Sequence, residues 1–202
     1  MRTVLALAAL TAPPALTAQV SFHLALGARH TTALVRDSIV APFDLRPDVG
    51  PVAALTAAVP LEHGWAADLT LDFSWSDLAR HEERRSVEVG ALRTVTGAVA
   101  LRRGLAPGFT ARVGVGGLKY WPEEDRGVFR DGAGPVIALG TLGIRYDLPL
   151  PRGRGLALEA RYDLHRFITP ALRSVGFTAP RAVHRLALLG SVRVWTARES
   201  AP

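Results

Sequence analysis

The chain has 202 residues, no cysteine and a formal net charge of +6 at pH 7. The absence of cysteine excludes disulfide frameworks, thiol nucleophiles and cysteine-based zinc sites. A basic balance can indicate nucleic-acid binding, but the basic residues are dispersed and form no run of five or more, so we expect no nucleic-acid partner. We expect the positive charge to meet anionic lipid or lipopolysaccharide instead.

The first residues have the order of a secretory signal peptide. Arg2 precedes an uncharged apolar run, a double proline interrupts the run at residues 13–14, and small residues follow up to Ala18. We therefore predict a signal peptide over residues 1–19, cleaved after Ala18 or Gln19, and a single exported domain over residues 20–202. An uncleaved membrane anchor is the alternative, and the double proline disfavours it because proline interrupts a helix.

Beyond the signal peptide, turn-forming segments divide the sequence into eight stretches in which apolar and polar side chains alternate, as they do in β-strands. None of these stretches contains a run of about 18 or more apolar residues, so the mature chain has no candidate membrane helix. The eight stretches cover residues 20–30, 50–59, 65–76, 87–101, 109–121, 136–148, 156–168 and 182–195.

The third stretch has the clearest pattern. The odd positions from Trp65 to Trp75 carry apolar side chains, whereas the even positions carry small, polar or acidic ones, including Asp68 and Asp72. Strands of soluble β proteins run to about 5–6 residues, and this one is about twice as long. A strand of this length, with tryptophan at both ends and carboxylates on one face only, predicts a transmembrane barrel whose apolar face is turned to lipid.

The connections between the stretches alternate between long and short. Long loops and short turns on opposite ends are typical of an up-and-down barrel with turns in the periplasm, an even number of strands and both termini on the periplasmic side. The predicted fold is therefore all-β, an eight-stranded antiparallel up-and-down transmembrane β-barrel. The long connections are residues 31–49, 77–85, 122–134 and 169–181, and the short ones are residues 60–64, 102–108 and 149–153.

Taken together, these features resemble the small eight-stranded outer-membrane barrels of the OmpA and OmpX kind. The resemblance rests on the signal peptide, eight alternating strands, short Pro/Gly turns, four longer polar loops and a last strand that ends at Trp195. It is one of architecture and covers nearly all of the predicted mature chain, although residues 196–202 follow the aromatic residue at which family members usually end. It implies a place in the bacterial outer membrane, lipid and lipopolysaccharide as neighbours, and the barrel-assembly machinery as a partner.

Three basic residues, Arg93, Lys119 and Arg166, fall on the face that is predicted to meet lipid. A basic side chain costs roughly 2–4 kcal/mol at the bilayer midplane and roughly 0–1 kcal/mol near the interface. The predicted strand directions put all three toward the outer leaflet, so we expect them to contact the phosphates of lipopolysaccharide. Ordinary snorkelling to the interface, or a strand of the opposite phase, is the alternative.

The opposite face carries charges of both signs. An eight-stranded barrel is only wide enough for its own side chains or one small ligand, so we expect these charges to fill the lumen as an ion-pair network. We expect Arg112, Arg145, Glu159 and Arg193 at similar depth in the periplasmic half. A narrow anion-preferring channel is the competing interpretation, because arginine exceeds acid by one in this set. The predicted network is Asp68, Asp72, Arg112, Arg145, Glu159, Arg161, Asp163, Arg185 and Arg193.

Candidates for catalysis are few. His165 and Asp163 face inward near the outer rim and Ser174 lies in the following loop, but neither a Gly-x-Ser-x-Gly motif nor a local His-x-Ser pair occurs. The histidines are scattered, which disfavours zinc, and the acidic segment 123–131 lacks the order of an EF-hand calcium loop. We predict that the protein is not an enzyme and has no cofactor or metal.

The expected role is structural or interactive: the barrel anchors in the outer membrane and presents its four long loops outside. A narrow channel for small solutes or anions is the alternative of a different class. A soluble periplasmic barrel or sandwich is a third interpretation, which the strand length and the outward tryptophans disfavour. The pattern identifies no ligand for the loops.

Overall fold

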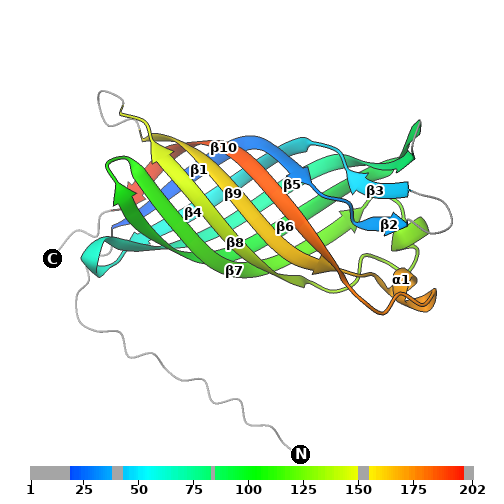
Figure 1. Cartoon of the computed structure of the whole chain (residues 1–202). Coiled ribbons are helices and arrows are strands. Elements are labelled where there is room, and N and C mark those ends of the chain that lie inside the picture. Colours follow the sequence, from blue (N-terminus) through cyan, green and yellow to red (C-terminus); the bar gives the residue numbers. More distant parts are fainter. Residues whose placement is uncertain (1–18, 38–42, 83–84, 150–154, 198–202) are drawn as a thin grey trace, which may run out of the picture.

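The computed structural model describes residues 19–37, 43–82, 85–149 and 155–197, so the predicted signal peptide lies outside the described residues except for Gln19. Within these residues, eight antiparallel strands close into a barrel in which each strand pairs with the next and the last pairs with the first (Figure 1). The predicted all-β up-and-down barrel is confirmed. The wall strands are β1 (Val20–Thr31), β4 (Gly50–Pro60), β5 (Trp65–Glu82), β6 (Arg85–Ala106), β7 (Phe109–Pro122), β8 (Ile137–Asp147), β9 (Leu156–Phe167) and β10 (Arg181–Ala197).

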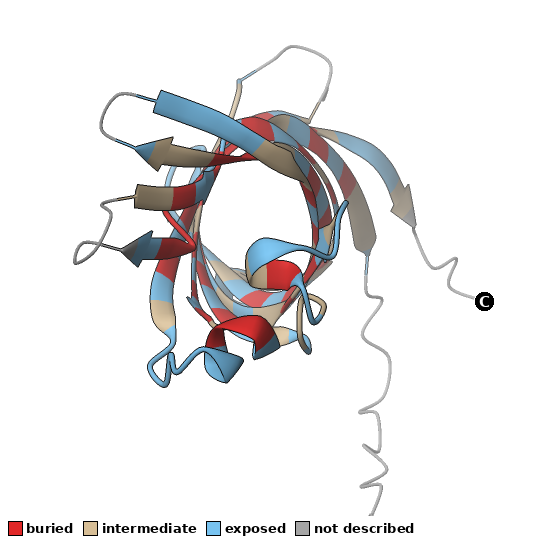
Figure 2. Ribbon diagram, turned by 90° about the vertical axis from the view of Figure 1, so that its right-hand side faces the viewer, coloured by how far each residue is buried: buried red, intermediate tan, exposed pale blue. Residues whose placement is uncertain are grey.

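Alternation along the strands turns apolar side chains outward and polar side chains inward. On β5, Leu69 and Leu71 are 60% and 57% exposed, whereas Asp68 and Asp72 are 4% and 2% exposed. Figure 2 looks along the barrel and shows buried and exposed residues alternating around the wall. A soluble barrel would bury its apolar face, so this inverted arrangement is the one that a lipid environment stabilises.

Tryptophans mark both edges of the outward apolar belt. Trp65 and Trp195 lie at one end of the barrel, and Trp75 and Trp121 lie toward the other. From Trp65 to Trp75 the strand rises about 23 Å, at about 3.3 Å per residue and a tilt of roughly 45°, which matches an apolar band about 25 Å tall. The barrel is therefore tall enough to span a bilayer.

The two ends of the barrel differ in the length of their connections. At the short-turn end, η1 (Glu62–Gly64) joins β4 to β5, and a tight turn with Gly108 at φ 77° joins β6 to β7. That turn requires a left-handed conformation, which glycine adopts without strain. The first and last described strands also meet here, since Val20 pairs with Ala197. The other end is called the long-loop end below.

Two predicted connections are largely strand, and those predictions are wrong. β5 and β6 remain paired up to Glu82 and Arg85, with one register shift after Leu78, so residues 77–82 belong to the barrel hairpin. At the opposite end β6 continues to Ala106 and pairs with Phe109. Charged side chains hide the alternation outside the membrane, but the backbone hydrogen bonds of an antiparallel pair do not depend on side-chain polarity.

The predicted connection 31–49 contains two further strands, β2 (Val35–Asp37) and β3 (Phe43–Pro47). β3 pairs with the outer part of β5, and β2 pairs with β3. Arg36 donates two hydrogen bonds to Asp44, at 2.6 and 2.9 Å. These hydrogen bonds hold the pKa of the Asp44 carboxyl below its usual range. The four strand segments 35–37, 43–47, 77–82 and 85–91 are called the outer sheet below.

An apolar cluster packs at the long-loop end of the lumen. Phe129 from η2 (Gly127–Phe129) packs edge-on against Phe167 at 6.0 Å between ring centroids, and Leu172 joins it from α1 (Pro170–Ser174). Within the described residues, no helix is long and apolar enough to cross a membrane. The cluster, called the apolar cap, consists of Leu34, Val35, Leu45, Leu78, Leu92, Leu118, Tyr120, Phe129, Leu139, Phe167, Leu172 and Val183.

Candidate functional site

Buried charges fill the lumen below the apolar cap, and they fall into two groups at different depths. The upper tier lies beneath the cap and the lower tier lies near the short-turn end. The upper tier consists of Arg29, Asp72, Arg161, Asp163 and Arg185, and the lower tier consists of His23, Asp68, Arg102, Arg112, Arg145 and Glu159.

The upper tier is organised around two carboxylates. Arg29 donates to both oxygens of Asp72, at 2.7 and 3.1 Å, and its second terminal nitrogen lies 3.7 Å from Asp163. Arg185, at 1% exposure, lies 3.9 Å from Asp163 and donates to hydroxyls on β6. Bidentate arginine–carboxylate pairs combine directional hydrogen bonds with charge, so they fix the positions of both partners.

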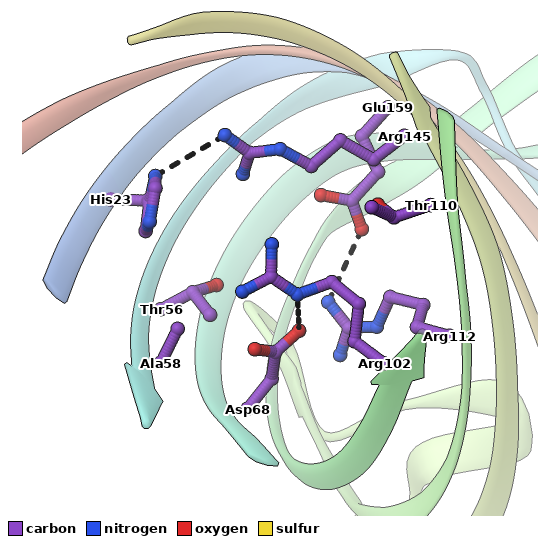
Figure 3. A pocket seen from close by; sticks show the side chains of 9 residues that line it. All are labelled: His23, Thr56, Ala58, Asp68, Arg102, Thr110, Arg112, Arg145 and Glu159. Atoms are coloured by element: carbon purple, nitrogen blue, oxygen red, sulfur yellow. Dashed lines mark hydrogen bonds and ion pairs between the residues drawn. The ribbon is translucent and has the colours of Figure 1, made fainter. Parts of the chain in front are cut away.

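The lower tier surrounds a cavity of about 10 Å³, which is enough for about one water molecule (Figure 3). Arg102 Nε lies 3.3 Å from Asp68, and Arg112 lies 3.2 Å from Glu159. Arg145 extends across the lumen, where its guanidinium donates to His23 Nδ1 at 3.3 Å. These side chains leave little open space across this part of the lumen.

Arg161 joins the two tiers. One terminal nitrogen lies 3.3 Å from Asp72 in the upper tier, and the other lies 3.0 Å from Glu159 in the lower tier. Its side chain is 3% exposed. Arg161 therefore joins the upper tier to the Arg112–Glu159 pair of the lower tier, whereas Asp68 pairs separately with Arg102.

The structure brings eight of the nine predicted network residues into these tiers and leaves one outside. Arg193 is exposed at the short-turn end and does not share the depth of Arg112, Arg145 and Glu159. The expectation that these four residues lie at one depth is therefore wrong for Arg193.

Two further arginines belong to the network, and sequence reasoning did not include them. Arg29 stands in phase with inward-facing His23 on β1, and Arg102 stands in phase with inward-facing Ala100 on β6. Arg29 lies within the predicted stretch 20–30, on its polar face, whereas Arg102 lies one residue beyond the stretch 87–101, in a predicted turn. Following the alternation to the end of each strand is the signal that identifies them.

The three basic residues predicted to meet lipopolysaccharide differ in their surroundings. Arg93 is exposed on the outer wall between Trp75 and Trp121 of the neighbouring strands, and Arg166 is exposed near the outer end of β9. Lys119 is half-buried, and its ammonium group donates a hydrogen bond to the backbone carbonyl of Gly134. The Lys119 contact ties β7 to the loop that follows it.

The residues considered for catalysis are not assembled into a site. His165 is hydrogen-bonded to Tyr120 at 2.8 Å, Asp163 lies against the arginines of the upper tier, and Ser174 donates to the Ala171 carbonyl at 2.9 Å. Each polar group is thus engaged in a separate structural contact. Among the described residues, no group of three or more His, Cys, Asp and Glu side chains is arranged to hold a metal ion.

Comparison with known proteins gives a likeness of fold. No protein-family model and no curated protein matches the chain. The outer membrane protein AlkL, determined by solid-state NMR in DMPC bilayers, matches with a TM-score of 0.51 at 14% identity, over 95% of this chain and 96% of AlkL. OprG from Pseudomonas aeruginosa matches with a TM-score of 0.46 at 11% identity, over 90% of this chain and 95% of OprG. The chain has the fold of the small outer-membrane β-barrels, as its architecture predicts.

Proposed function

We propose that this protein is a non-catalytic outer-membrane barrel with a structural or interaction role, whose lumen is closed and whose outer sheet and long loops are presented outside the cell. The observation that carries this proposal is the dense packing of the lumen. Ion-paired side chains occupy the barrel in both tiers, Arg161 links the tiers, and the apolar cap packs at the long-loop end. A solute would have to displace both layers to cross.

The outward surface supports the location. The exposed apolar belt and its tryptophan edges fit a bilayer about 25 Å thick, and the fold is that of small outer-membrane barrels. Short turns face the periplasm in barrels of this kind, so we assign the long-loop end to the outside. Outer-membrane lipid and the barrel-assembly machinery are the partners that this location implies.

The outer sheet supports an interaction role. Residues 85–90 of β6 pair with β5 alone, and β2 pairs with β3 alone, so both edges of the outer sheet carry unpaired backbone groups among the described residues. Exposed sheet edges are templates for an extended segment of a partner. This surface lies beyond the apolar belt, at the long-loop end (Figure 1).

Planar-bilayer recording of the refolded protein separates this role from transport. We expect no discrete conductance steps, because the network and the cap leave no continuous path. A general porin inserted in the same bilayers shows that openings are detectable, and a heat-modifiable gel band shows that the sample is folded.

The channel alternative has one observation in its favour: six guanidinium groups face four buried carboxylates in the described lumen. Reproducible anion-selective steps would establish that alternative and contradict the proposed closure.

Lipopolysaccharide contact is the second part of the proposal. Arg93 and Arg166 are exposed at the outer edge of the belt, where phosphates lie, whereas the ammonium group of Lys119 already has a backbone partner. We expect the double variant R93A/R166A to lose most of the lipopolysaccharide that co-purifies with the protein, and K119A to retain it. The control is R103A, which removes an exposed arginine at the short-turn end. Equal retention by the double variant and this control would exclude the contact.

A further inference from the structure

The lumen opens at the short-turn end into a vestibule of about 180 Å³. Its charged lining residues are Arg102 and Arg193, and no described residue that lines it is acidic. Ser21 and Thr196 add polar side chains around the rim. The vestibule therefore presents two guanidinium groups and hydrogen-bonding groups to one small volume that is open to solvent.

A β-bulge aims Arg193 into this mouth. In the β1–β10 pairing, Phe22 lies opposite Trp195 and His23 lies opposite Arg193, so Val194 is an extra residue on β10. Without the bulge, Arg193 and Trp195 would share a face of the strand. With the bulge, Trp195 stacks on Phe22 on the outer wall, with 5.4 Å between the ring centroids, while Arg193 lies on the lumen side with His23. Bulges recur where a side chain must be re-aimed.

The Arg193 side chain packs against Gly155, which directly precedes β9. The Arg193 backbone N–H donates to the Gly155 carbonyl at 2.9 Å. A Cβ atom added at Gly155 would lie 3.0 Å from Cβ, 3.3 Å from Nε and 3.5 Å from Cζ of Arg193. Any side chain at residue 155 would occupy the space that the Arg193 side chain fills. The position of the Arg193 guanidinium therefore depends on glycine at residue 155.

The charge behind the vestibule does not neutralise Arg193. Asp68 is paired with Arg102, and Glu159 is shared between Arg112 and Arg161. Asp147, at the edge of the lower tier, is paired with Arg145 at 2.9 Å. These three carboxylates are thus each engaged by an arginine other than Arg193, and Glu62, in the exposed turn before β5, does not line the vestibule. Arg193 therefore adds a positive charge that no described carboxylate lining the vestibule offsets, and low-dielectric walls strengthen its field.

We propose that this vestibule is a binding site for an oxyanion, a phosphate or carboxylate group, with Arg193 and Arg102 as its ligands. In the assigned orientation the site faces the periplasm. The group is carried either by a soluble periplasmic molecule or by a lipid headgroup of the inner leaflet, since both present the same chemistry. Arg193 and Arg102 would bind the oxyanion whether or not the outer sheet has a partner and whether or not the barrel conducts ions.

The test is a titration with inorganic phosphate, using the chain refolded in a maltoside detergent that contains no phosphate. Arginine Nε–Hε resonances are followed by NMR, and the Arg193 signal is assigned by its absence in R193Q. We expect a saturable shift of the Arg193 and Arg102 signals. We expect R193Q to weaken phosphate binding about tenfold, as judged from the Arg102 signal, since a charged hydrogen-bond donor is lost.

Two variants serve as controls. R103Q removes the same charge at the same end, but Arg103 is stacked on the outward ring of Trp65 at 5.2 Å, so phosphate affinity should be unchanged. G155A keeps every charge and should weaken binding by displacing Arg193. All variants must give the heat-modifiable band of a folded barrel.

The source of the oxyanion is separated in nanodiscs without added phosphate. A shift of Arg193 when phosphatidylglycerol replaces phosphatidylcholine supports the site and assigns it to a lipid headgroup, whereas a shift with soluble phosphate alone supports the site and assigns it to a soluble group. The proposal is overturned if neither arm gives a saturable shift, or if R193Q and R103Q weaken binding equally.

Discussion

Asp72 is the carboxylate on which the upper tier depends. It accepts two hydrogen bonds from Arg29 and is paired with Arg161, and it is 2% exposed. Removing one partner of a buried ion pair leaves the other charge without compensation, which costs about 3–5 kcal/mol. The asparagine variant keeps the shape of the side chain, so this loss is separated from any loss of packing.

We therefore predict that D72N lowers the free energy of unfolding by about 3–5 kcal/mol, measured by urea titration of the folded protein in detergent. D77N is the matched control, because Asp77 is exposed on the same strand, and its effect should stay within about 0.5 kcal/mol. Equal unfolding midpoints for the two variants would show that the upper tier contributes no stability.

Residue positions in the lumen were partly predictable from alternation. The inward placement of Asp68, Asp72 and Glu159 follows from a period of two. Alternation does not say which residues of neighbouring strands lie side by side. The contacts of Arg161 with both tiers could therefore be identified only from the pairing register of the structure. The surroundings of Arg193 could not be predicted either. The bulge at Val194 changes the direction of the neighbouring side chains, and the alternating pattern does not reveal it.

At the scale of the strand, the glycines of β7 allow β6 and β7 to approach closely. A Cβ at Gly114 would lie 2.2 Å from the Val99 carbonyl oxygen and 2.6 Å from Ala100 Cβ. Backbone atoms cannot yield as the end of a flexible side chain can, so the two strands would have to separate. Gly116 makes the same close approach, since a Cβ there would lie 2.2 Å from the Gly97 carbonyl oxygen.

We predict that G114A destabilises the barrel by about 1–3 kcal/mol, the usual range for overpacking, measured as a lower urea midpoint. Gly97 on β6 is the control, since a Cβ there meets nothing within 4 Å. G97A should leave the midpoint unchanged or raise it slightly, because alanine restricts the unfolded chain. A neutral G114A would mean that the β6–β7 spacing is not limited by this glycine.

The membrane-crossing parts of the strands were predictable, and their extensions were not. The stretch 65–76 reads as a strand because lipid and lumen impose opposite polarities on its two faces. Beyond the membrane that contrast disappears, so the outer hairpin at 77–85 and the strands at 35–37 and 43–47 carry no clear period. Their structure comes from backbone pairing with β5.

At the scale of the whole molecule, closure of the barrel follows from the sequence, but closure of its lumen follows only in part. Charged residues of alternating strands predict the ion-pair network. The apolar cap has no such signal in the loops, because Phe129 and Leu172 lie in connections without a regular apolar pattern. Only the folded loops bring them together over the network.

Gel mobility with and without boiling, measured on the chain refolded in detergent, tests most directly that this is a closed barrel with its apolar face outward. The account predicts a heat-modifiable band together with β-rich circular dichroism, since a closed ring of hydrogen-bonded strands resists unfolding by detergent. A protein that stays soluble without detergent and shows no shift on boiling would contradict the outward assignment of the apolar face, and with it the lipid-facing role of Arg93 and Arg166.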